Sequence, residues 1–113
     1  MMLDWNTYQQ QLLVGIGQIG KISPETVRGY RELSDAGNKT GKLDAKTREL
    51  IALAVAVTRQ CDGCITVHTD AAVKHGATRE EIAEALGVAI AVNAGAALVF
   101  SARVMDAYSA KTA

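Results

Sequence analysis

The only two cysteines of the chain lie three residues apart, in the segment Cys61-Asp62-Gly63-Cys64. Two thiols at this spacing can close a disulfide and open it again, and the start of a helix favours thiolate over thiol. His68 follows Cys64 by four residues, so on a helix the three side chains share one stripe. An imidazole one turn from a thiol can accept its proton or stabilise its anion. The segment therefore predicts a thiol redox site.

A carboxylate lies upstream of this site. Glu49 stands just before the uncharged segment 50–58, on an otherwise apolar helix face. If the helices that carry Glu49 and His68 pack as an antiparallel pair turning near Gln60, the two side chains lie within about one turn of each other. We therefore expect Glu49 to serve as a general base.

The same residues leave a metal site open as an alternative. Cys61, Cys64 and His68 could supply three zinc ligands, with Glu49 or His75 as the fourth. Structural zinc sites usually draw their ligands from two separate knuckles, and the chain has no second C-x-x-C and no paired histidines. We therefore expect neither a metal nor a cofactor at the site, and we expect His75 to interact with the dipole at the end of its helix.

Helix signals divide the chain into five or six helices. Ser23 before Pro24 and Asp44 read as N-caps, and Thr78 with Glu81 forms a capping box. The segment Asn93-Ala94-Gly95 is expected to interrupt the last long helix. The expected helices cover about residues 4–19, 24–37, 45–60, 61–75 and 78–92, and a final stretch that ends near residue 108.

The composition supports an all-α fold. The chain has 113 residues, of which 49% are hydrophobic but only 4% aromatic, and 19 are alanine, the best helix former. Patterns typical of β-strands are absent. We expect one domain over residues 1–113, a compact bundle of five or six helices. Twelve basic residues balance twelve acidic ones with no basic run, which argues against nucleic-acid binding.

The sequence also bears on the compartment and on membranes. The first residues show no basic segment followed by an apolar one, so no secretory signal is expected. The uncharged stretch between Glu84 and Arg103 has 18 residues, the lower edge for a membrane span, and contains Gly87, Asn93 and Gly95. We expect no membrane segment and a cytoplasmic protein, in which thiols stay reduced.

Apolar residues cover more than one face of two expected helices, at about 45–60 and 78–92. A helix that is hydrophobic all round must be buried on all sides. In so short a chain, other subunits are needed for part of that cover. We therefore expect a homo-oligomer, a trimer or a hexamer, with the uncharged stretch before Arg103 at the interface.

The pattern Glu49, eleven residues, Cys61-x-x-Cys64-x-x-x-His68 resembles the alkyl hydroperoxidase D branch of the carboxymuconolactone decarboxylase-like family. The resemblance extends over about Val27 to Ala107. It includes four further segments: Arg48-Glu49-Leu50-Ile51-Ala52-Leu53-Ala54-Val55, His75-Gly76-Ala77-Thr78, Glu81-Ile82-Ala83-Glu84-Ala85-Leu86 and Asn93-Ala94-Gly95-Ala96-Ala97.

The resemblance implies an all-helical antioxidant fold that forms trimers or hexamers and reduces peroxides with thiols. In that family the second cysteine attacks the peroxide and the first resolves it, so Cys64 would be peroxidatic and Cys61 resolving. Glu49 and His68 would relay protons. The implied partners are a peroxide and an external dithiol, borne by a lipoyl-bearing or thioredoxin-like protein.

The chain departs from the better-studied peroxidases at Gly63, where they have a histidine, and it is shorter. The true decarboxylases of the superfamily lack this cysteine pair, so decarboxylation of a lactone acid is not expected. A decarboxylase-family protein with a redox-inert site is the remaining alternative.

Two arguments about the cysteines point in opposite directions. The helix dipole favours Cys61, the residue nearest the helix start, as the thiol of lower pKa. The resemblance favours Cys64, which also has His68 as its i+4 neighbour. We expect Cys64 to attack the peroxide, because an adjacent imidazolium can lower the pKa of a thiol further than a dipole can.

Overall fold

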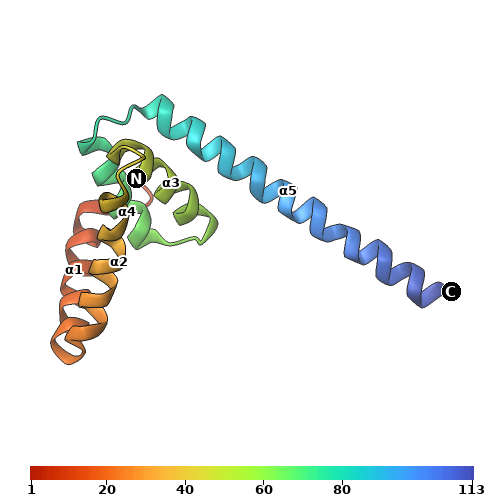
Figure 1. Cartoon of the computed structure of the whole chain (residues 1–113), viewed down its shortest axis with the longest axis horizontal. Helices are drawn as coiled ribbons and strands as arrows, with labels where there is room; N and C mark the ends of the chain where they lie inside the picture. The colour runs from red at the N-terminus through yellow and green to blue at the C-terminus, as the bar shows by residue number, and fades with distance from the viewer.

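The computed structural model describes residues 1–113 and is all-α, with five helices and no strand (Figure 1). This confirms the predicted fold class. The helices are α1 (Trp5–Ile22), α2 (Pro24–Thr40), α3 (Ala45–Thr58), α4 (Asp62–Lys74) and α5 (Arg79–Thr112).

Helices α3, α4 and the start of α5 form the centre of the chain. α3 packs against both α4 and α5, and α1 packs against α2 and α4. In Figure 1, α1 and α2 form a hairpin on one side, whereas α5 runs away from the other helices toward the C-terminus. The site expected between α3 and α4 therefore lies in the best-packed part of the molecule.

Several helix ends differ from the sequence predictions. α1 continues past residue 19 to Ile22, α2 passes through Gly37 to Thr40, and α3 ends at Thr58 instead of residue 60. Ser23 occupies the N-cap of α2, as predicted, but its hydroxyl contacts Thr26 Oγ1 and makes no cap hydrogen bond.

The expected interruption at Asn93-Ala94-Gly95 is absent, because α5 is one helix of 34 residues. The Asn93 amide group donates to Ala89 O and to Thr58 Oγ1, both at 2.8 Å. The bond to Thr58 ties this turn of α5 to the end of α3 and so supports the continuous helix. The surrounding alanines favour the helix, so the single glycine, Gly95, does not interrupt it.

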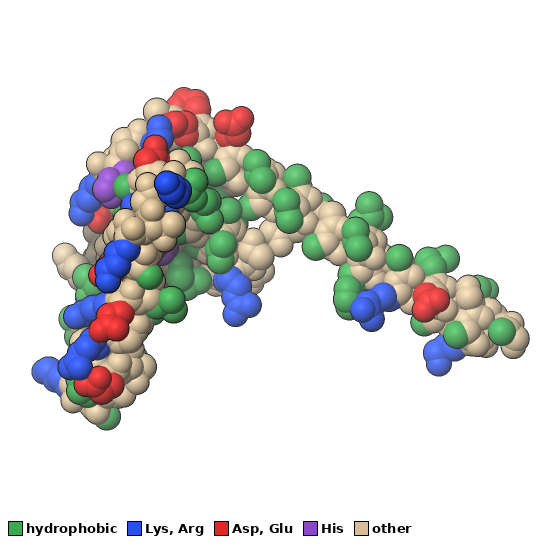
Figure 2. Space-filling view, in the orientation of Figure 1, with side chains coloured by type: hydrophobic (Ala, Val, Ile, Leu, Met, Phe, Trp, Pro, Cys, Tyr) green, Lys and Arg blue, Asp and Glu red, His purple; other side chains and the backbone are tan.

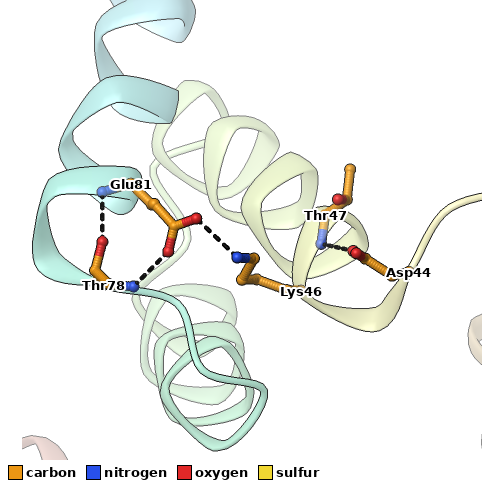
Figure 3. Close-up of polar contacts among 5 residues, drawn as sticks. All are labelled: Asp44, Lys46, Thr47, Thr78 and Glu81. Atoms are coloured by element: carbon orange, nitrogen blue, oxygen red, sulfur yellow. Dashed lines mark hydrogen bonds and ion pairs between the residues drawn. The ribbon is translucent and has the colours of Figure 1, made fainter.

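Polar contacts fix the starts of α3 and α5 and join them (Figure 3). Asp44 accepts from the Thr47 N–H at 2.8 Å, and Thr78 and Glu81 form the predicted capping box. Glu81 also pairs with Lys46 Nζ at 2.8 Å. A single carboxylate thus caps α5 and ties its first turn to α3.

The single chain is not compact, contrary to the prediction. Its radius of gyration is 18.6 Å, whereas a globular chain of this length has about 13 Å. Only five residues are buried, namely Leu53, Ala56, Thr66, Ala72 and Ala89. Figure 2 shows hydrophobic side chains along the visible face of α5, in contact with no other helix of the chain over its distal half. The five helices form as expected, but within a single chain most of their apolar side chains stay exposed.

By length and composition alone, α5 could cross a membrane. Its most apolar 18-residue window has a mean hydropathy of 1.9, and 6% of that window is buried. Helices that are covered by other protein meet the same criterion. One such helix is weak support for a membrane span.

Candidate active site

The turn between α3 and α4 places the first cysteine. After α3 ends, Gln60 takes a left-handed conformation with φ +53°, and the Cys61 N–H then donates to Ala56 O at 3.1 Å. This closes the end of α3 and reverses the chain, so that α4 returns along α3. The predicted antiparallel pair is therefore present.

Cys61 is the N-cap of α4. Its Sγ accepts from the Cys64 N–H at 3.2 Å, the position in which a serine or aspartate oxygen usually acts. The two Sγ atoms lie 2.7 Å apart, and both cysteines are free and partly buried. The spacing that predicted a redox pair thus brings the two sulfurs within reach of each other.

The two thiols ionise differently. The pKa of Cys61 is lowered, first because the Cys64 thiol donates to its sulfur and second because the Cys64 N–H does. The pKa of Cys64 is raised, mainly by its hydrogen bond to Cys61 and further by burial. Of the two thiols, Cys61 is therefore the one that ionises first. The expectation that Cys64 has the lower pKa is wrong, whereas the helix-dipole argument gave the correct direction.

Glu49 and His68 meet across the α3–α4 interface. Glu49 Oε2 lies 2.7 Å from His68 Nδ1, and the two side chains are 21% and 28% exposed. This contact confirms the expected approach of the two residues. Because an ionised carboxylate only accepts hydrogen bonds, Nδ1 carries the proton and Nε2 is the nitrogen left to exchange one.

A cavity of about 230 Å³ connects the cysteines with His68. α1 and α2 contribute part of its wall, which the spacing of the site residues did not predict. The only sequence signal for that wall is the i, i+4 spacing of Leu12 and Ile16 on one face of α1. The lining residues are Leu12, Ile16, Tyr30, Cys61, Gly63, Cys64, Val67 and His68. Most of the wall is apolar, so the sulfurs face a pocket that suits an uncharged ligand.

Gly63 allows α1 to approach the start of α4. A Cβ atom at this position would lie 2.9 Å from Leu12 Cδ2, too close for a side chain unless Leu12 moves. The leucine thus fills the space that a residue between the cysteines would otherwise need. A histidine at position 63 would require the Leu12 side chain to move.

The structure gives no support to the zinc alternative. No three side chains of histidine, cysteine, aspartate or glutamate are grouped so that they could hold a metal ion. His68 Nδ1 is engaged by Glu49, and His75 is exposed at the C-cap of α4, away from the cavity.

A larger cavity, about 480 Å³, lies between α1 and α4 around Trp5, Gln9 and Thr66. It contains no cysteine and no histidine. The smaller cavity is therefore the better candidate, since only that one holds groups able to exchange electrons and protons.

Comparisons with known proteins agree with this fold. The sequence profile described as the carboxymuconolactone decarboxylase family matches residues 24–107. An uncharacterized protein of Haemophilus influenzae is 47% identical over 113 residues, the full length of both chains. A carboxymuconolactone decarboxylase family protein of Legionella pneumophila, solved in its apo form, has a TM-score of 0.74 and 38% identity over 93% of this chain and 94% of its own. A protein of Methanobacterium thermoautotrophicum has a TM-score of 0.72 and 29% identity over 79% and 97% of the two chains. The profile covers well over half of the residues, and the chain belongs to the carboxymuconolactone decarboxylase family.

Proposed function

We propose that this protein reduces hydroperoxides with its two thiols and closes a Cys61–Cys64 disulfide. One arrangement carries the proposal: the two sulfurs, 2.7 Å apart, face a cavity that His68 also lines, while Glu49 holds that histidine. Nucleophile, resolving thiol and proton carrier are thus on one small surface. The overall reaction consumes two thiols and one hydroperoxide and yields a disulfide, an alcohol and water.

In the proposed first step the Cys64 sulfur attacks the peroxide. One proton is shared between two sulfurs in contact, so the anion that rests on Cys61 can pass to Cys64 when Cys61 takes the proton. The Cys64 thiolate then attacks the terminal oxygen of the hydroperoxide, the O–O bond breaks, and Cys64 becomes a sulfenic acid. His68 holds the proton that the thiol pair releases when it ionises, and the Glu49 carboxylate stabilises the resulting imidazolium. The departing alkoxide takes this proton and leaves as the alcohol.

In the second step Cys61 resolves the sulfenic acid. The Cys61 thiol loses its proton to His68, and its sulfur attacks the Cys64 sulfur. The S–O bond breaks, and the hydroxide that leaves takes that proton back from His68 and becomes water. The Cys64 N–H, which is unaffected by oxidation of the Cys64 sulfur, can still stabilise the Cys61 thiolate that attacks.

An external dithiol returns the disulfide to two thiols by exchange through a mixed disulfide. We propose a lipoyl-bearing or thioredoxin-like protein as that reductant. A cytoplasmic location is part of the same proposal, because reducing conditions there would restore the dithiol after each turnover.

Stopped-flow mixing and thiol titration test the proposal. One equivalent of cumene hydroperoxide, added to the reduced protein, should remove two thiols per chain and form an intramolecular disulfide. Dihydrolipoamide or reduced thioredoxin should then restore both thiols. Unreactive thiols, or one thiol lost per chain with no disulfide, would contradict the proposed function.

Single substitutions assign the cysteines. We expect Cys64→Ser to abolish the first reaction with peroxide, whereas Cys61→Ser should react once and stop at a sulfenic acid or beyond. If Cys64→Ser forms a sulfenic acid at the wild-type rate while Cys61→Ser does not react, the roles are reversed.

The two histidines of α4 give a matched pair for the proton relay. His68→Gln should slow the reaction with peroxide by about 100-fold, the low end of general acid–base effects. His75→Gln, outside the cavity on the same helix, should react like the wild type. Equal rates for both variants would remove His68 from the mechanism.

A further inference from the structure

The cavity beside the cysteines has two walls of different origin. Helix α4 provides the first wall, with His68 beside the cysteine pair, whereas α1 and one residue of α2 provide the second. The residues of α1, Trp5–Ile22, precede the segment 24–107 that the family profile matches. Most of the second wall therefore lies outside the segment by which the family is recognised.

Leu12 is the residue of this wall that lies against the cysteine segment. A Cβ atom at Gly63 would lie 2.9 Å from Leu12 Cδ2, 3.6 Å from Cδ1 and 3.9 Å from Cγ. The whole branched end of the leucine therefore lies against the backbone of Gly63, the residue just before Cys64. Both Leu12 and the cysteines line the same cavity.

The position of Leu12 is set by helix packing. The Asp4 carboxylate caps α1 by accepting from the Thr7 N–H at 3.2 Å, and α1 packs against both α2 and α4. Near the start of α1, the hydroxyl of the buried Thr66 lies 3.4 Å from Trp5 O. Leu12 is half-buried, whereas its neighbour Leu13 is 56% exposed and lies outside the cavity.

From these contacts we infer that Leu12 is a specificity-determining residue, which limits the size of the molecule that reaches the sulfurs. The cavity holds about 230 Å³, below the roughly 300–1,000 Å³ of pockets for drug-sized ligands. Truncation of Leu12 would enlarge the cavity on the side of Gly63. The inference rests on the proposed function for its substrate, a compact hydroperoxide, but the same barrier acts on any reagent that attacks the thiols.

Hydroperoxides of two sizes test the barrier within the proposed reaction. The measured quantity is the ratio of the second-order rate constants for cumene and tert-butyl hydroperoxide. Leu12→Ala should raise this ratio at least about 10-fold, because a single methylene in an apolar pocket already changes specificity by about 10-fold or more. Leu13→Ala, on the same helix but outside the cavity, should keep the wild-type ratio. Oxidation of the thiols with one ratio in all three proteins would overturn the inference and leave the proposed function intact.

Maleimides of two sizes test the barrier without a peroxide. N-phenylmaleimide and N-methylmaleimide share one reactive group, so the ratio of their alkylation rates reports access to the thiols. Leu12→Ala should raise the phenyl-to-methyl ratio by about 10-fold, and Leu13→Ala should not change it. If this ratio rises in Leu12→Ala although hydroperoxides leave the thiols unreacted, the inference stands and the proposed function fails. An unchanged ratio would overturn the inference. Leu12→Val, which removes one carbon, should shift both ratios in the same direction by less, and it replaces Leu12→Ala if that variant does not fold.

A double-mutant cycle tests the contact between Leu12 and Gly63. Gly63→Ala places a Cβ 2.9 Å from Leu12 Cδ2, whereas in the Leu12→Ala or Leu12→Val background part of that space is free. Helix propensity favours alanine over glycine equally in both backgrounds, so the difference between them isolates the contact. In urea titrations Gly63→Ala should be less favourable in the wild type than in the truncated background. Equal effects in both backgrounds would remove the contact on which the inference depends and overturn it.

Discussion

Cys61 occupies a position that serine, threonine, aspartate or asparagine usually fills at the start of a helix. Its sulfur accepts both the cap bond from the Cys64 N–H and the hydrogen bond from the Cys64 thiol. Both hydrogen bonds stabilise the Cys61 thiolate. The redox pair and the start of α4 are therefore one structure, and the ionisation of Cys61 depends on its neighbour three residues on.

Removing the Cys64 thiol should raise the pKa of Cys61. In the wild type this pKa is lowered, so Cys61 keeps its thiolate, and its reactivity toward iodoacetamide, to lower pH than an ordinary thiol. Cys64→Ala removes the largest cause of the shift, so the alkylation profile should move to higher pH. Cys64→Ser keeps a hydroxyl donor and should move the profile less. An unchanged profile in Cys64→Ala would show that the hydrogen bond is not the cause.

Gln60 should be replaceable by glycine with a gain in stability. α2 and α4 are each followed by a glycine with positive φ, Gly41 at 67° and Gly76 at 83°, whereas α3 is followed by Gln60 at 53°. A left-handed conformation costs an L-residue roughly 1–2 kcal/mol, and the added freedom of an unfolded glycine offsets part of the gain. We expect Gln60→Gly to raise the free energy of unfolding by about 0.5–1 kcal/mol in urea titrations.

Arg59 is the matched control for this substitution, because it precedes Gln60 and is right-handed, with φ −83°. Arg59→Gly should lower stability by up to about 1 kcal/mol. If both glycines destabilise the fold, the left-handed conformation at residue 60 is not a source of strain.

The spacing of the site residues predicted which of them meet, but not how they share protons. Cys61 and Cys64 lie on one turn, and antiparallel helices bring Glu49 to His68, so both contacts follow from helix geometry. The order of ionisation depends instead on the contact between the sulfurs and on the cap bond. The positions of Leu12 and Tyr30 at the cavity depend on packing between helices far apart in sequence, which no local pattern encodes.

At the scale of elements, local signals located the helix starts better than the helix ends. Asp44 and Thr78 cap as predicted, since capping is a contact within four residues. The end predicted at Gly37 and the interruption at Gly95 are both wrong. A single glycine lowers helix propensity by only about 1 kcal/mol, which alanine neighbours and a tertiary bond such as that from Asn93 to Thr58 can outweigh.

The contact between α3 and α5 should weaken in acid. Lys46 and, to a lesser degree, the Thr78 N–H lower the pKa of Glu81, so the folded state holds the carboxylate ionised to lower pH than the unfolded chain does. The resulting stability is fully present above the unfolded pKa and is lost as the pH falls through the folded pKa. Glu81→Gln should therefore lower the melting temperature near neutral pH and reduce its further fall in acid.

Glu80→Gln is the control for this prediction, because it removes an exposed carboxylate of the same helical turn that forms no ion pair in the chain. Thermal melts monitored by circular dichroism over the acid range would compare the two variants. If Glu80→Gln flattens the acid dependence as much as Glu81→Gln does, the pair with Lys46 is not responsible.

At the scale of the whole molecule, a chain with five buried residues cannot gain much stability by itself. If a second copy supplies the missing cover, folding and association are one equilibrium. The melting temperature should then rise by about 3 °C for each tenfold increase in protein concentration. Val92→Asp, which places a charge on the exposed apolar surface of α5, should melt at a lower temperature that does not change with concentration. A concentration-independent wild type would contradict the coupling.

The hydrogen bonds that Cys61 accepts would also affect the reduction potential of a Cys61–Cys64 disulfide. They stabilise the anion of the dithiol, and a disulfide sulfur, having no charge, gains much less from the same donors. Whatever stabilises the reduced form of a couple raises its reduction potential, as for other strongly oxidising thiol pairs. If the two cysteines form a disulfide as proposed, the donors at the start of α4 shift that couple toward more oxidising potentials, so a mild dithiol should reduce it. The first turn of one short helix would then set both the acidity of a thiol and the driving force for its regeneration.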